Sequence, residues 1–161
     1  MKLTILAAGK IKEQYYSDAV KEYSKRLSRY ASLSIEEVMD EPTPEKAGAS
    51  QKARILDKEG ERFLKILARY PGAYVIALAI DGKMFDSVSF SSHLSDLNVR
   101  GNSHLIFVIG GSLGLSAQVL DKADEKISFS RMTFPHQLMR VILLEQIYRA
   151  QRIGRGEPYH K

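Results

Sequence analysis

The sequence predicts one α/β domain over residues 1–161, built on a mostly parallel sheet with helices on both faces. Short apolar runs alternate with longer stretches of helical periodicity along the whole chain. A chain of 161 residues is long enough for a real core and too short for two ordinary domains. Neither a repeat nor a linker nor a low-complexity segment interrupts the alternation, so we expect a single folding unit.

The first half of the chain alternates strand and helix twice. The two prolines that follow the second strand each remove a backbone donor and restrict the residue before them, so that segment is a surface loop. Gly60 is an unfavourable residue for the middle of a helix, although the periodicity continues through it. The expected elements are a strand over 2–8, a helix over 13–30, a strand over 32–38, the loop over 40–45 and a helix over 49–70.

The second half repeats the alternation and ends in a long helix. Pro71 and Gly72 stop the preceding helix, and Pro135 suits the first turn of the last one. The glycines and proline of the final segment exclude a helix there. The expected elements are a strand over 73–80, a turn over 81–83, helices over 87–98 and 116–122, strands over 105–109 and 126–130, a helix over 135–153 and a non-helical tail over 154–161.

Three strand ends predict the position of the active site. The apolar strand 105–109 ends abruptly in a glycine-rich segment over 110–114, whose glycines allow positive φ and close approach of a ligand. The strands before 81–83 and before 131–134 also end in irregular segments. Open α/β sheets bind ligands beyond the carboxyl ends of their strands, so we place the site where these exits meet. Taken alone, the glycine-rich segment fits a tight turn as well as a ligand loop.

Several common chemistries are excluded by missing motifs. The chain lacks the P-loop, the dinucleotide fingerprint and the nucleophile elbow of hydrolases. It has no cysteine, which excludes disulfides and thiolate metal sites and fits a reducing compartment. The four histidines show no ligand spacing, so we expect no metal. No window is apolar enough for a membrane span, and the amino terminus is a first strand rather than a signal peptide.

The net charge of +5 is concentrated at the two ends of the chain. Residues 1–30 carry seven basic against three acidic side chains, and residues 131–161 carry six against two. The middle of the chain is slightly acidic. This distribution favours contact with a polyanion through the chain ends, with solvated helix faces as the alternative.

The last helix and the tail carry an unusual density of hydrogen-bonding side chains. Glu145, Arg149 and Arg152 fall on one stripe of the helix, where they form either an intrahelical ion pair or a ligand-facing row. His136 follows Pro135 at the start of the helix, where a surface position is equally compatible with the pattern. The tail is expected to be flexible and to add little to stability, and to become ordered against a partner.

These segments resemble the RlmH family of SPOUT-class ribosomal RNA methyltransferases. The resemblance extends from end to end, although residues 31–70 carry little of it. Its motifs are LTILAxGK over 3–10, FVIGGSxGL over 107–115, SFSRMTFPHQLMR over 128–140, EQxYRA over 145–150 and GEPYH over 156–160.

The resemblance implies a cytoplasmic homodimer with a deep trefoil knot in its carboxy-terminal part. It further implies methylation, from S-adenosylmethionine, of N3 of a pseudouridine in helix 69 of 23S ribosomal RNA within the assembled ribosome. The implied cofactor-binding residues are Leu78, Gly110, Phe129, Ser130, Arg131, Met132, Thr133 and Phe134.

Transfer of a methyl group to N3 requires the loss of its proton near the transition state. We assign His160 as the candidate base, with Arg152 and Tyr159 positioning the target base or its oxygens and Glu145 holding an arginine. Two other functions remain open: a knotted methyltransferase acting on transfer RNA, and a ribosome-associated RNA-binding protein without catalysis.

Overall fold

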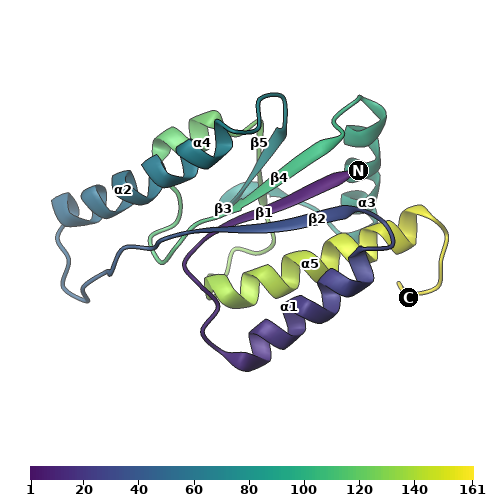
Figure 1. The fold of residues 1–161 in the computed structure, drawn as a ribbon, viewed down its shortest axis with the longest axis horizontal. Helices are drawn as coiled ribbons and strands as arrows, with labels where there is room; N and C mark the ends of the chain where they lie inside the picture. The colour runs from purple at the N-terminus through teal and green to yellow at the C-terminus, as the bar shows by residue number, and fades with distance from the viewer.

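Strands and helices alternate along the chain in the computed structural model, which describes all 161 residues (Figure 1). The amino-terminal strand and the long last helix have nearly the bounds predicted from the sequence. The elements are β1 (Lys2–Ala8), α1 (Gln14–Leu27), β2 (Ser32–Val38), α2 (Ala49–Leu67), β3 (Tyr74–Met84), α3 (Ser87–Val99), β4 (His104–Ile109), α4 (Ala117–Lys122), β5 (Glu125–Ser128) and α5 (His136–Gly154).

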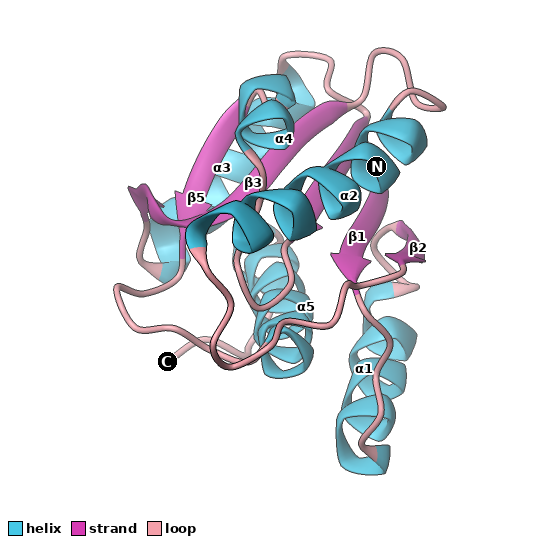
Figure 2. Cartoon of the chain, turned by 90° about the vertical axis from the view of Figure 1, so that its left-hand side faces the viewer, coloured by secondary structure: helices cyan, strands magenta, loops and turns pink.

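All strand pairs of the sheet are parallel, in the order β2-β1-β4-β3-β5. The helices α1, α3 and α5 pack on one face, around buried residues such as Phe107 and Leu143, whereas α2 and α4 cover the other face. In the turned view of Figure 2, α2 and α4 lie in front of the strands and α3 lies behind them. Because both faces are covered, the interior strands β1 and β4 are apolar along nearly their whole length, as the sequence predicted.

The strand β3 is longer than predicted, because the expected turn over 81–83 is wrong. The pairing with β5 shifts between Leu78 and Lys83, so the residues between them bulge out before the chain rejoins β5. A Cβ on Gly82 would lie 2.5 Å from the carbonyl carbon of Ile127. Glycine is therefore required by the close approach of two backbones rather than by a turn.

The strand β5 stops at Ser128, two residues earlier than predicted. The hydroxyl of Ser128 donates to the carbonyl of Ser130 (2.9 Å), and the hydroxyl of Ser130 accepts from the amide of Met132 (2.9 Å). These local bonds give the backbone an alternative to the sheet ladder, so the chain leaves the sheet here.

The tail does not hang free, which contradicts the expectation of a flexible segment. Tyr159 packs edge-on against Tyr148 with ring centroids 4.9 Å apart. Glu157 accepts a hydrogen bond from the hydroxyl of Tyr30 (2.5 Å) and pairs with Arg152 (2.9 Å). Composition alone indicated a loose end, whereas these aromatic and charged side chains find partners on α5 and at Tyr30, which follows α1.

No helix combines the length and the apolar character needed to cross a membrane. No group of three or more histidine, aspartate or glutamate side chains is arranged to hold a metal ion.

Candidate active site

The ends of β4 and β5 and the bulge of β3 after Leu78 meet around one cavity of about 510 Å³ at the carboxyl edge of the sheet, where the sequence predicted three strand exits. Leu78 reaches it from β3, Gly110 from the end of β4, and the segment after β5 supplies the third side. Arg131 is exposed and does not line the cavity. The other implied cofactor-binding residues all line it: Leu78, Gly110, Phe129, Ser130, Met132, Thr133 and Phe134.

The glycine-rich loop after β4 is closed by its own backbone. A Cβ on Gly110 would lie 2.3 Å from the carbonyl oxygen of Gly114. The amide of Gly114 donates to the carbonyl of Gly111 (3.1 Å), and Gly114 has a φ of 81°. The glycine at 110 is therefore needed for the loop to form, and not only for the approach of a ligand as the sequence indicated.

His136 also lines the cavity. The sequence was equally compatible with a surface position for this residue, and the structure does not support that alternative. Its ring is partly buried, and Nδ1 is buried without a hydrogen-bond partner. Burial lowers the pKa of His136, the nearby Arg140 guanidinium lowers it further, and Asp40 opposes these effects. The imidazole is therefore neutral at physiological pH, and its place directly after the third strand exit was the sequence signal for it.

The cavity contains no charged side chain that would repel a cationic ligand. No lysine or arginine lines it, and its only histidine is neutral for the reasons given above. Most of the lining is apolar, and Ser130 and Thr133 add hydroxyls. A volume of about 510 Å³ is within the usual range for small-molecule sites. S-adenosylmethionine, with a flat adenine and a cationic sulfonium, fits these properties.

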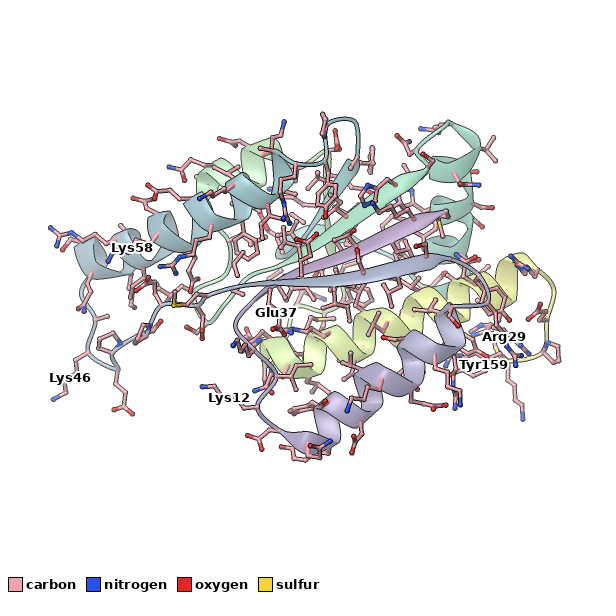
Figure 3. All side chains as sticks on the ribbon, in the orientation of Figure 1. Lys12, Arg29, Glu37, Lys46, Lys58 and Tyr159 are labelled. Atoms are coloured by element: carbon pink, nitrogen blue, oxygen red, sulfur yellow. The ribbon has the colours of Figure 1, made fainter.

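Arg140 connects the start of α5 to the end of β1. The sequence indicated it only as one of the hydrogen-bonding side chains of the last helix, and its burial was not predicted. Its side chain is 1% exposed and pairs with Glu37 at 2.5 Å. It also donates to the carbonyls of Ala8 and Gly9. Figure 3 shows Glu37 beside the first turns of α5. A long charged side chain on an otherwise apolar face was the available signal, because such a residue is buried only with partners.

The tail residues assigned to catalysis lie in a different place, outside the lining of this cavity. The hydroxyl of Tyr159 donates to Oε1 of Glu145 (3.0 Å), which also pairs with Arg149 (2.6 Å), so the intrahelical ion pair is present. Arg149 donates to Nδ1 of His160 (3.3 Å), and Arg152 donates to the carbonyl of Pro158 (2.8 Å). Burial raises the pKa of Tyr159 to about 12, and the hydrogen bond to Glu145 contributes.

The two groups of residues lie along the same helix. Glu145 follows His136 by nine positions, which is about 13 Å along the helix axis. Figure 3 shows Tyr159 toward the carboxy-terminal end of α5, away from Glu37 at its start. The structure therefore brings the cofactor candidates together and brings the tail residues together, but it separates the two sets by about half the length of α5.

Comparisons with known proteins identify relatives over the whole chain. A family model described as predicted SPOUT methyltransferase matches residues 1–160. A ribosomal RNA large subunit methyltransferase H from Clostridium acetobutylicum is 55% identical over 161 residues, which cover 100% of both chains. A protein of the same description from Bifidobacterium adolescentis is also 55% identical with the same coverage.

A solved structure shares the fold at low sequence identity. It is the structure of a probable methylase family protein from Haemophilus influenzae Rd KW20, with a TM-score of 0.56 and 11% identity. The match covers 99% of this chain and 70% of the other. At this identity the likeness supports the architecture alone.

Proposed function

The chain belongs to the SPOUT methyltransferase family, and from this membership we propose that it methylates N3 of a pseudouridine in helix 69 of 23S ribosomal RNA. The methyl donor in this proposal is S-adenosylmethionine, and the substrate is the assembled ribosome. Relatives that are 53–56% identical over the full length include proteins named for methylation of large-subunit ribosomal RNA.

The observation that carries the proposal is the cavity at the carboxyl edge of the sheet. It joins three strand exits, has apolar walls and contains no cationic side chain, so it admits a sulfonium without repulsion. When bound, S-adenosylmethionine supplies an activated methyl group for an in-line displacement. The protein contributes positioning and a water-poor site, through Leu78 and Gly110 on one side and the residues from Phe129 to Phe134 other than Arg131 on the other.

The second requirement is removal of the proton from N3. We assign this step to His160, whose Nδ1 accepts a hydrogen bond from Arg149 in the structure. Arg149 must release that nitrogen before it accepts a proton, so the tail has to shift when the substrate binds. Tyr159 remains a neutral donor at physiological pH, because its pKa is about 12. Arg152 holds the tail through Pro158 and Glu157.

His160→Ala tests this assignment. We expect methylation to fall about 10²–10⁴-fold, the range for removal of a general base. Affinity for S-adenosylmethionine and melting temperature should stay unchanged, because His160 is exposed and lies outside the cavity lining. Full activity of the variant would contradict the role of His160 without affecting the proposed substrate.

The remaining parts of the proposal concern assembly. We propose a cytoplasmic homodimer of one-domain subunits over residues 1–161, with the carboxy-terminal part threaded into a trefoil knot. Contact with the ribosome is assigned to the basic ends of the chain. The exposed side chains of Lys21 and Lys25 on α1 and of Arg29 just after it belong to that basic surface, and Figure 3 shows Arg29 near the tail.

The experiment is methylation of purified ribosomes by the purified protein with labelled S-adenosylmethionine. We expect one methyl group per ribosome, on a pseudouridine, and no label on transfer RNA offered in parallel. Label on transfer RNA alone would replace the substrate in this proposal. Calorimetry without detectable cofactor binding would instead favour an RNA-binding protein without catalysis.

A further inference from the structure

A second cavity, of about 420 Å³, adjoins the proposed cofactor cavity. The two share part of their lining, including Ile127, Ser128, Phe129 and Phe134. A methyl transfer needs two ligands whose reacting atoms lie about 3–3.5 Å apart, so the second ligand has to sit beside the first. The position of this second cavity meets that requirement.

Aromatic rings form much of the wall of the second cavity. Phe90 is buried and lies between Phe85 and Phe129, with ring centroids 6.1 Å and 5.9 Å away. Phe134 completes the aromatic lining. Such walls suit a flat, unstacked nucleobase, because protein aromatic rings stack on the faces of bases.

The polar groups of the second cavity keep unused hydrogen-bonding capacity. Oε1 of Gln146 accepts from the hydroxyl of Ser87 (2.8 Å), and Nε2 donates to Glu145 (2.6 Å). A side-chain amide has two N–H groups and two acceptor lone pairs, so one of each remains for a ligand. At the exposed rim, Oδ1 of Asp86 accepts from the amide (2.7 Å) and the hydroxyl (2.8 Å) of Ser89, and the carboxylate has further lone pairs available.

The tail lies near the same rim. Hydrogen bonds from Ser89 are the main cause of the lowered pKa of Asp86, and the proximity of His160 contributes to it. Glu145, which holds Tyr159, directly precedes Gln146 on α5. The second cavity therefore lies between the cofactor cavity and the tail residues that were assigned to proton removal.

We infer that this second cavity holds the target base, a uracil ring with a free N1–H. The inference rests on the proposed function and assigns the site for its substrate. His160 takes the proton of N3 after the tail has shifted over the bound base, and N3 then faces the shared wall. The free N–H of Gln146 donates to a carbonyl oxygen that gains negative charge as N3 loses its proton. Asp86 accepts from N1–H, a group that pseudouridine has and uridine lacks. The cavity thereby both holds the base and selects pseudouridine.

The first experiment compares Gln146→Leu with Gln151→Leu. Gln151 is on the same helix and lines neither cavity, so it provides the same chemical change as a control. We expect Gln146→Leu to lower kcat/KM for ribosomes about 10²-fold, as for loss of one donor to a developing oxyanion. Affinity for S-adenosylmethionine should be unchanged in both variants, and Gln151→Leu should retain full activity.

A cavity-filling variant tests the same space sterically. Ile142 lines the second cavity and not the first, and it is partly exposed. Ile142→Phe should retain cofactor binding and lose methylation. Equal methylation by Gln146→Leu, Ile142→Phe and the wild type would overturn the inference. Loss of cofactor affinity in either folded variant would also overturn it, because the second cavity would then belong to the cofactor.

The selectivity for pseudouridine gives a readout that does not depend on the amount of folded protein. Ribosomes with uridine at the target position are obtained from a strain that lacks the pseudouridine synthase. We expect the wild type to prefer pseudouridine ribosomes at least about 10-fold, since a site with polar partners rejects an analogue lacking the matching group. Asp86→Ser retains a good helix cap and should abolish the preference.

An unchanged preference in Asp86→Ser would refute the contact with N1–H. Failure of the wild type to methylate either kind of ribosome would refute the proposed function instead. The two failures are therefore distinguishable within one set of assays.

Discussion

The docking of the tail predicts that Tyr159 stabilises the folded chain, contrary to what its place near the terminus implies. Its ring packs against Tyr148, Arg149 lies 4.7 Å from the ring centroid, and its hydroxyl bonds Glu145. We compare Tyr159→Phe, which removes the hydroxyl alone, with Tyr159→Ala, which removes the ring as well. The two variants separate the hydrogen bond from the aromatic packing.

The expected losses follow from these contacts. A hydrogen bond to a charged acceptor contributes about 1.5–3 kcal/mol when buried, and the partial exposure of Tyr159 reduces this to about 1 kcal/mol. The edge-on ring pair adds about 1 kcal/mol. For a domain of this size, 1 kcal/mol corresponds to about 2–4 °C in melting temperature. Tyr159→Phe should therefore melt about 2–4 °C below the wild type, and Tyr159→Ala about 4–8 °C below it.

The pH dependence gives an independent check on the hydroxyl. The pKa of Tyr159 in the folded chain is about 12, above the ordinary value of 10.0. A raised pKa means that the stabilising contribution is complete below pH 10 and is lost as the pH rises toward 12. Tyr159→Phe should lack this part of the pH profile. Thermal denaturation showing wild-type melting for Tyr159→Ala would refute docking of the tail in solution.

Three further predictions concern the cavity and the basic surface. Gly110→Val should lose affinity for S-adenosylmethionine together with thermal stability, because the new side chain collides with the loop backbone; normal cofactor binding by calorimetry would contradict this. Changing Lys21, Lys25 and Arg29 to glutamine should weaken ribosome binding. The slope of log binding constant against log salt concentration should become shallower by about 0.7–0.9 for each phosphate that the variant no longer neutralises. An unchanged slope would show that these side chains only face solvent. Arg140→Met should cost about 3 kcal/mol in denaturant unfolding, because it leaves two carbonyls and the partly exposed Glu37 without the guanidinium that they contact; a loss below about 1 kcal/mol would show that this network adds little.

The fold was largely predictable because its main signals are local. A strand that is covered on both faces has to be apolar throughout, and β1 and β4 were recognised by this property. The helices of the outer layers carry one apolar stripe each, so their periodicity was visible as well. The meeting of three strand exits at one cavity also followed from the rule for parallel sheets.

The structural features that the sequence did not predict depend on contacts between distant parts of the chain. The bulge at Gly82 arises because that residue touches the backbone of Ile127, and a sequence read locally shows only a turn-like triplet. The burial of Arg140 depends on carbonyls at the end of β1, far away in sequence. The docked tail depends on Tyr30, which follows α1, and on Tyr148 of α5, and composition cannot reveal these contacts.

In the candidate site, too, the local features were predicted from the sequence and the long-range contacts were not. The glycine at 110 was identified correctly as a loop residue, but its reason lies in Gly114 rather than in a ligand alone. The second cavity combines Phe85 and Asp86 with Gln146 of α5, which is far away in sequence, so no motif spacing indicated it.

Mass spectrometry of 23S ribosomal RNA from a strain that lacks this gene tests the proposed function most directly. We predict the loss of one methyl group, from N3 of a single pseudouridine in helix 69. The wild-type gene should restore that methyl group, and the His160→Ala variant should not restore it to the wild-type level. An unchanged modification pattern in the deletion strain would contradict the proposed function.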